Sequence, residues 1–251
     1  MTAATPPRIL VIAGSDSSGG AGIQADIKTI TMLAGYAMTA ITAVTAQNTT
    51  GVQGVVALPA DFVAQQIESC LSDIGADAVK IGMLGSPEIA CGVADRLEGL
   101  SIPVVFDPVM VATSGSVLAD EATIAAFERL MALATLTTPN VAELGALGGA
   151  DAMAARGVAY LAKGGDADGP DVEDRLARSG QPDQVWRSLR IHTRHTHGTG
   201  CTLSSAIATY LGMGVPLPEA IGKAREFVRA ALLAAPGFGQ GHGPMGHQAV
   251  R

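Results

Sequence analysis

Several residue types from which common classes of protein are built are scarce in this sequence. The 251 residues include only three cysteines, five phenylalanines, three tyrosines and one tryptophan. The cysteines form no CxxC pair and are odd in number, which disfavours a disulfide framework and indicates reduced thiols in a cytoplasmic protein. So few aromatic residues argue against an interaction module built on aromatic anchors.

Positive charge and long apolar runs are also lacking. The net charge is −7 and no basic stripe runs along the chain, so nucleic acid is not expected as a partner. The apolar run 9–13 is too short for a secretory segment, and the uncharged stretch 29–60 carries Thr, Gln, Asn, Gly and Pro throughout. The sequence therefore predicts neither a signal peptide nor a membrane span.

Two signature motifs are absent and a third is incomplete. The chain has no G-x-x-x-x-G-K-[ST] and no G-x-S-x-G, which excludes a P-loop ATPase and argues against a nucleophile-elbow hydrolase. Segment 20–25 matches the dinucleotide fingerprint G-x-G-x-x-A, but no Asp or Glu follows between Asp26 and Asp61 to hold a ribose. A glycine loop lying against a small ligand is the better interpretation.

Apolar residues and glycine are abundant, at 48% of the chain and 31 residues respectively. Short apolar runs alternate with amphipathic segments of helical period, which predicts an α/β fold with a largely parallel sheet covered on both faces, in one domain spanning 1–251. The predicted strands are 8–14, 37–47, 78–81, 103–106, 136–138 and 158–163, with an edge strand or hairpin at 184–191. The predicted helices are 23–34, 61–74, 87–97, 120–133 and two that begin at Thr199 and Pro218, and 167–183 is expected to be a surface loop.

Polar residues cluster directly after the predicted strands. In open α/β sheets, ligands bind outside the carboxyl ends of the strands, so one rim of the sheet should hold the site. The residues collected there are 15–22, Gln47, Met83, Asp107, Asn140 and Lys163.

The stretch from His197 to Thr202, with the sequence HGTGCT, is the strongest candidate for a reaction site. A glycine turn that enters a helix leaves backbone N–H groups unpaired, and the helix adds about half a positive charge at that end. Such a turn binds anions, and a phosphoryl group in transfer suits it best. The alternative is an ordinary helix start without a ligand.

Cys201 and three histidines leave several interpretations open. At a helix N-terminus the pKa of Cys201 should fall, and the thiol could act as a nucleophile with His197 as its base, or it could only pack the turn. His192, His195 and His197 have no acid or cysteine partner at suitable spacing, so a metal triad is disfavoured.

Two acids and a lysine at the rim also allow two interpretations. Asp107, Glu143 and Asn140 suit Mg²⁺, which takes oxygen ligands and bridges phosphate oxygens. Alternatively, Asp107 caps its own loop and Glu143 complements a helix dipole. Lys163, which leaves a buried strand into Gly164-Gly165, is a candidate for neutralising phosphate.

Together these segments resemble the ribokinase-like superfamily and, within it, the hydroxymethylpyrimidine/phosphomethylpyrimidine kinases of thiamine biosynthesis. The motifs occur in family order between Ile9 and about His247. They are 12–16 with 18–29, 45–49, 80–84, 107–110, 138–140 with Glu143, 163–165, 197–202 and 241–244.

The resemblance implies a ribokinase-like three-layer fold and ATP- and Mg²⁺-dependent phosphorylation of 4-amino-5-hydroxymethyl-2-methylpyrimidine and of its monophosphate. It also implies a small-molecule substrate and a homodimer. Carried over by motif, the ring and its hydroxymethyl group are expected at Gly14, Asp26, Gln47 and Met83, the metal at Asp107 and Glu143, the nucleotide phosphates at Asn140, Lys163 and Thr199, and the anion hole at Gly198, Thr199, Gly200 and Cys201.

Cys201 stands where many sugar kinases of the superfamily carry an aspartate base, and we expect it to assist deprotonation without forming a phosphoenzyme. Two departures from the family pattern concern the nucleotide side: Asp166 replaces a histidine, and the stretch between Glu143 and Val158 is short, with a helix reduced to about 151–156. Two other functions therefore remain open. One is a pyridoxal/pyridoxine kinase, and the other is a non-catalytic pyrimidine-binding module.

Overall fold

The central feature of the structure, a computed structural model that describes residues 5–112, 115 and 117–250, is a nine-stranded sheet. Its strands are β1 (Arg8–Asp16), β2 (Tyr36–Asn48), β3 (Gly51–Ala57), β4 (Ala78–Ile81), β5 (Val104–Phe106), β6 (Leu136–Thr137), β7 (Tyr160–Ala162), β8 (Asp171–Arg178) and β9 (Gln181–Leu189). They lie in the order β3-β2-β1-β4-β5-β6-β7-β8-β9. The six strands from β2 to β7 in this order pair in parallel, and β3, β8 and β9 add antiparallel flanks.

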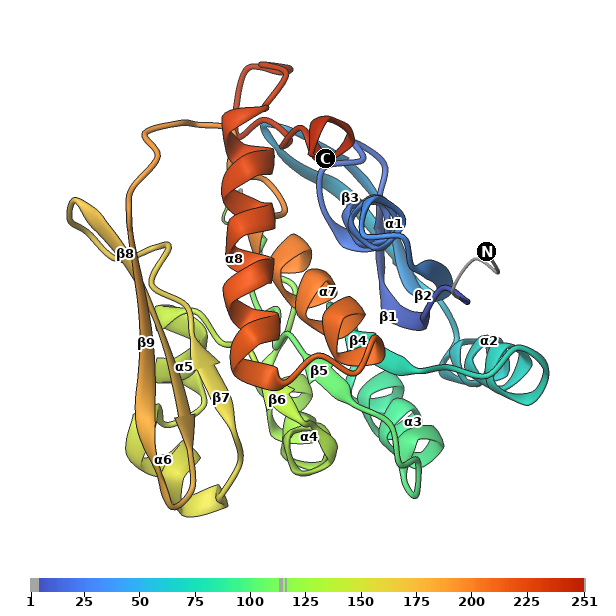
Figure 1. Cartoon of the computed structure of the whole chain (residues 1–251). Helices are drawn as coiled ribbons and strands as arrows, with labels where there is room; N and C mark the ends of the chain where they lie inside the picture. Colours follow the sequence, from blue (N-terminus) through green and yellow to red (C-terminus); the bar gives the residue numbers. More distant parts are fainter. Residues whose placement is uncertain (1–4, 113–114, 116, 251) are drawn as a thin grey trace.

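Helices cover both faces of this sheet (Figure 1). They are α1 (Gly22–Met32), α2 (Ala60–Asp73), α3 (Pro87–Leu97), α4 (Glu121–Leu133), α5 (Val141–Ala146), α6 (Gly149–Arg156), α7 (Thr199–Gly212) and α8 (Leu217–Leu233), with a 3₁₀ turn at His247–Ala249. The predicted α/β class, with a mostly parallel sheet between helices, is therefore confirmed. Among the described residues, no helix combines the length and the apolar character needed to cross a membrane.

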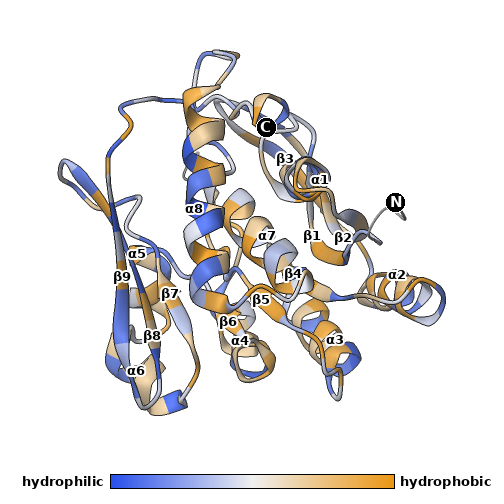
Figure 2. Ribbon diagram, viewed as in Figure 1, coloured by the Kyte–Doolittle hydropathy of each residue, from blue (hydrophilic) through white to orange (hydrophobic). Residues whose placement is uncertain are grey.

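Alternating residues of β1 pack into two separate hydrophobic cores, one on each face of the sheet. Leu10 and Ile12 pack with α2, α3 and α4, whereas Ile9 and Val11 pack with α1, α7 and α8. Because successive side chains of a strand point to opposite faces, a strand buried on both sides must be apolar at nearly every position. Figure 2 shows this contrast: the central strands are mainly hydrophobic, and β9 at the sheet edge is mainly hydrophilic.

One prediction of local structure was wrong, and one strand was not predicted. The stretch 167–183, expected to be a surface loop, contains β8, whose inward residues Asp174 and Leu176 are buried between charged neighbours. Asp174 is buried because the guanidinium Nε of Arg225 on α8 donates to it over 2.6 Å, so a charged residue occupies an inward position. The antiparallel strand β3 was not predicted, because its exposed sequence resembles a loop.

Candidate active site

One cavity of about 440 Å³ opens at the carboxyl ends of the parallel strands. Its wall includes residues from the ends of β1, β2, β5 and β7 and from the first turn of α7. Of the residues predicted for the site, the cavity brings together Gly14, Gln47, Met83, Asp107, Asn140, Glu143, Lys163, Gly198, Thr199, Gly200 and Cys201. Asp166 also lines it, from the exposed loop between β7 and β8.

Asp26 is the exception, because it does not line the cavity. Its side chain is fully buried, one oxygen lies 3.0 Å from the ammonium of Lys80, and the other accepts from the hydroxyl of Ser205 over 2.6 Å. Burial raises the pKa of Asp26, and the charge of Lys80 opposes that rise. The prediction that Asp26 contacts a substrate is therefore wrong, because both of its oxygens are occupied in a buried ion pair and a hydrogen bond.

The turn before α7 has the features of an anion site. Gly198 is the N-cap with a φ of +84°, and no side chain caps the helix or places an acid in its first turn. A Cβ at Gly198 would overlap the backbone carbonyl oxygen of Gly20, so only glycine fits there. The first N–H groups of α7 consequently remain free of side-chain partners at the cavity wall.

A lysine between two carboxylates lies next to this turn. The ammonium of Lys163 is 2.6 Å from Asp107 and 3.7 Å from Glu143, and a Cβ at Gly200 would stand 3.3 Å from it. Thr138 donates to the same oxygen of Asp107 over 2.8 Å. The absence of a side chain at Gly200 thus leaves the start of α7 open to the Lys163–Asp107 pair.

The charges of this group are mutually stabilised. Burial works to raise the pKa of Asp107, but the ammonium groups of Lys163 and Lys80 outweigh it and hold that pKa below its usual value. Burial is also the largest influence on Glu143 and raises the pKa of this carboxyl. For Lys163, the two carboxylates outweigh burial and raise its pKa, so the ammonium stays charged.

Asn140 and Glu143 also form the capping box of α5, in which each side chain accepts from the other's backbone N–H over 2.8 Å. Glu143 therefore lies in the first turn of a helix, as the helix-dipole interpretation required, and also in the cavity wall. The oxygen of the Asn140 amide is used by the cap, which leaves its NH₂ group for a ligand.

The carboxylates of Asp107 and Glu143 are oxygen donors of the kind Mg²⁺ takes, so the residues present fit such an ion. In the described part of the chain no group of three His, Cys, Asp or Glu residues is arranged to hold a metal. A divalent ion here would therefore need phosphate oxygens or water to complete its coordination.

The expected fall in the pKa of Cys201 was wrong. Burial raises the pKa of this thiol to about 11, although the charge of Lys80 works in the opposite direction. Removal from water outweighs the helix end, because a thiolate loses more solvation than the partial charges of the turn return. His197 is not placed as a base for Cys201 either, since its Nε2 lies 2.8 Å from Asp16.

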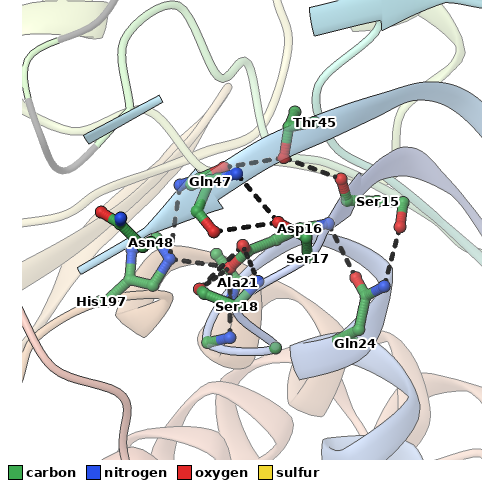
Figure 3. Close-up of polar contacts among 12 residues, drawn as sticks. Ser15, Asp16, Ser17, Ser18, Ala21, Gln24, Thr45, Gln47, Asn48 and His197 are labelled. Atoms are coloured by element: carbon green, nitrogen blue, oxygen red, sulfur yellow. Dashed lines mark hydrogen bonds and ion pairs between the residues drawn. The ribbon is translucent and has the colours of Figure 1, made fainter. Parts of the chain in front are cut away.

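Gln47 and Met83 line another part of the cavity wall, which we call the ring pocket (Figure 3 shows the polar groups around Gln47). A Cβ at Gly14 would overlap the methyl group of Met83, so glycine lets that side chain approach β1. The amide of Gln47 is close to the hydroxyl of Thr45 and, at 3.4 Å, to the ring of His197. This pocket offers an apolar wall and one amide to a flat polar ring.

Asp16 and His197 lie in the predicted site segments 15–22 and 197–202, but the contact between them was not predicted. Lys80 lines the cavity and was not predicted as a site residue, because it lies inside the apolar run of β4. A lysine in an otherwise apolar buried strand was the one available signal, because such a charge requires a buried partner.

Comparisons with known proteins agree with this geometry. Residues 16–246 match a family model described as phosphomethylpyrimidine kinase. The chain is 44% identical over 257 residues to a hydroxymethylpyrimidine/phosphomethylpyrimidine kinase from Streptomyces coelicolor, covering 97% of this chain and 95% of that protein. It is 45% identical to the thiamine biosynthesis bifunctional protein ThiED of Geobacter sulfurreducens, covering 95% of this chain and 52%, about half, of that relative. Among solved structures, the ADP complex of Bacillus subtilis pyridoxal kinase superposes with a TM-score of 0.87 at 34% identity, covering 98% of both chains.

Proposed function

The chain belongs to the phosphomethylpyrimidine kinase family, and we propose that it transfers the γ-phosphoryl group of ATP to 4-amino-5-hydroxymethyl-2-methylpyrimidine and then to the resulting monophosphate. The observation that carries the proposal is that one cavity joins a ring pocket at Gln47 and Met83 to the turn 198–201 and Lys163. An acceptor held in the pocket would reach a phosphoryl group held at the turn.

In the proposed reaction, the hydroxymethyl oxygen bonds to the γ-phosphorus as the bond between that phosphorus and the bridging oxygen of ADP breaks. The N–H groups of the turn and the ammonium of Lys163 stabilise the charge on the transferred group, and Gln47 orients the acceptor ring. Mg²⁺, held by Asp107, Glu143 and phosphate oxygens, would share the phosphate charge when bound. Only the thiolate of Cys201 can take up the hydroxyl proton, and with a pKa of about 11 this form is a small fraction at neutral pH; otherwise the proton leaves to water or to a phosphate oxygen late in the transfer.

Asn140 and Thr199 complete the proposed nucleotide side. Asn140 and Thr199 both line the cavity, where the NH₂ group of the first and the hydroxyl of the second would donate to phosphate oxygens. ATP as the donor is supported by the kinase relatives and by the ADP complex of the B. subtilis protein.

Pyridoxal is the competing acceptor, because that solved pyridoxal kinase has a similar fold over nearly the whole chain. The two acceptors share a six-membered nitrogen ring with a hydroxymethyl group. We favour the aminopyrimidine because a Gln amide both donates and accepts, which pairs with a ring nitrogen and a neighbouring amino group together.

The test is to incubate the protein with ATP, Mg²⁺ and either acceptor and to measure ADP release and the phosphorylated product. We expect a higher kcat/KM for the aminopyrimidine. A clear preference for pyridoxal would reassign the substrate, and pyrimidine binding without turnover would identify a non-catalytic module.

Replacing the ring-binding amide provides a sharper check. Gln47→Ala is expected to raise the KM for the aminopyrimidine by about tenfold or more, because a polar ring edge loses its partner, while the KM for ATP stays within about twofold. Steady-state kinetics with each substrate varied separately measures both constants. Equal changes in the two constants would contradict a ring-binding role.

We also propose that residues 1–251 form one domain and assemble as a homodimer. The continuous nine-stranded sheet supports the first statement. The exposed Val55 and Val56 on the outer strand β3 are an apolar surface that fits the second. Light scattering coupled to size exclusion measures the mass, and a monomer at micromolar concentration would contradict the dimer.

A further inference from the structure

The imidazole of His197 connects two parts of the cavity that come from distant parts of the sequence (Figure 3). Its Nε2 lies 2.8 Å from Asp16 Oδ2 and 3.4 Å from the end of the Gln47 side chain. The side chain is buried, and the next residue is Gly198 of the proposed phosphoryl-binding turn. His197 therefore stands between the ring pocket and the turn.

Asp16 fixes which atom of His197 carries a proton. The carboxylate accepts from the backbone N–H groups of Ser18, Gly20 and Ala21 and from the Ser18 hydroxyl. With so many donors directed at it, the carboxylate carries no proton of its own. Nε2 of His197 must therefore be the donor in the 2.8 Å contact, whether the ring is neutral or charged.

This proton determines the orientation of the Gln47 amide. The hydroxyl of Thr45 spends its single hydrogen on the carbonyl of Ser15, 3.0 Å away. In the structure the Nε2 of Gln47 faces Nε2 of His197 at 3.4 Å and its Oε1 faces the Thr45 hydroxyl at 3.2 Å, so two donors meet and Thr45 must divide its one hydrogen between two acceptors. The two ends of an amide are assigned from the bonds they make. With the oxygen toward His197, the Nε2–H is shared between Asp16 and Gln47, the NH₂ group donates to Thr45, and no two donors face each other.

We propose that His197 and Asp16 are positioning residues that lock the amide of Gln47 with its oxygen beside the turn 198–201 and its NH₂ group beside Thr45. The proposal rests on the proposed function of the site. A ring that pairs with this amide must place its amino group on the side of the turn and its ring nitrogen on the side of Thr45. In 4-amino-5-hydroxymethylpyrimidine the hydroxymethyl group is adjacent to the amino group, so the lock directs the reacting oxygen toward the phosphoryl site.

Two substitutions at position 197 separate this role from packing. His197→Phe keeps a flat ring but removes the donor, whereas His197→Gln places an amide N–H near the former Nε2. We expect His197→Phe to raise the KM for the aminopyrimidine by about tenfold or more, with the KM for ATP within about twofold and the KM for pyridoxal within about threefold. His197→Gln should restore the aminopyrimidine KM to within about threefold of the parent value.

Two further variants complete the design. His192→Phe, a change at an exposed histidine outside the cavity wall, is the matched control and should leave all three constants unchanged. Gly20→Ala directs a methyl group onto the ring of His197 without removing a polar group, and it should raise the same KM as His197→Phe. It tests the proposal independently if His197→Phe does not fold, as judged by circular dichroism.

Equal losses for the aminopyrimidine and for pyridoxal, or a His197→Gln variant that is folded but as impaired as His197→Phe, would overturn the proposal. Failure of the proposed function would look different: the unaltered protein would show no turnover of the aminopyrimidine. Calorimetric titration of that ring without ATP would then still compare the parent protein with its variants. If His197→Phe bound the aminopyrimidine as tightly as the parent protein, that result alone would refute the positioning role.

Discussion

Two lysine–aspartate pairs lie close together in this protein and differ in solvent exposure and in the number of groups that surround them. Lys80 and Asp26 are 3.0 Å apart and both side chains are 0% exposed. Lys163 and Asp107 are 2.6 Å apart, with the lysine 12% and the aspartate 1% exposed. We call the first pair, between β4, α1 and α7, sealed because neither side chain is exposed to solvent, although Lys80 contributes to the cavity wall. The second, open pair lines the cavity at the ends of β5 and β7.

The difference shows that the same ion pair can serve structure or chemistry. Asp26 has its remaining oxygen occupied by Ser205, so the sealed pair is complete without a ligand. Lys163 instead stands between Asp107 and Glu143 beside the start of α7, where an added phosphate would meet its charge. We therefore expect loss of the first pair to affect mainly folding and loss of the second to affect mainly turnover.

Breaking the sealed pair should have the largest effect. Lys80→Met leaves the carboxylate of Asp26 buried without a counter-charge, and we expect the free energy of unfolding to fall by about 3–5 kcal/mol. Denaturant titration measures the loss. The double variant Lys80→Met/Asp26→Leu should recover much of it, because no unpaired charge remains. If Lys80→Met alone were fully stable but inactive, the sealed pair would act in turnover and not in folding, contrary to our assignment.

Breaking the open pair should mainly slow the reaction. Lys163→Met removes a preorganised cation, and we expect kcat to fall about 10²–10³-fold, with a smaller loss of unfolding free energy than in Lys80→Met. Lys223→Met is the matched control, because Lys223 forms an exposed pair with Glu219 on α8. Steady-state assays with saturating substrates measure kcat. An unchanged kcat in Lys163→Met would refute the assignment.

Charges of both pairs act on the pKa of Cys201, and we expect its substitution to have the smallest effect on kcat. Burial raises the pKa of its thiol to about 11, so the thiolate fraction increases about tenfold for each pH unit gained between neutrality and that value. If the thiol takes up the acceptor proton, kcat of the parent protein rises with pH over that range. Cys201→Ala should have a flat profile and about a tenfold lower kcat at pH 9. Parallel profiles would show that the thiol only packs.

The parts of the fold that could be predicted from the sequence are those in which one local pattern decides the structure. The continuous apolar run of β1 and the glycine turn before Thr199 are such cases, and both lie where expected. The position of the site at one rim of the sheet could also be predicted, because the carboxyl ends of parallel strands meet at one edge.

The features that could not be predicted depend on contacts with residues far away in the sequence. Asp26 lies on the buried face of α1 with Ile23 and Ile30, and its charge is stabilised there by Lys80 and Ser205. The pKa of Cys201 depends on burial that no local motif reveals. The strand character of β8 was hidden by its charged residues, one of which, Asp174, is paired with Arg225, 51 positions later in the chain.

The contact between Gly198 and Gly20 has a consequence for how this protein can change by mutation. Any side chain at Gly198 would meet main-chain atoms of Gly20, which no substitution at position 20 can remove. No second-site suppressor at that contact is therefore available, and selection for a new substrate should leave glycine at this position in every survivor. Retargeting by directed evolution would instead start at Gly14 and Met83, where the opposing group is a movable thioether.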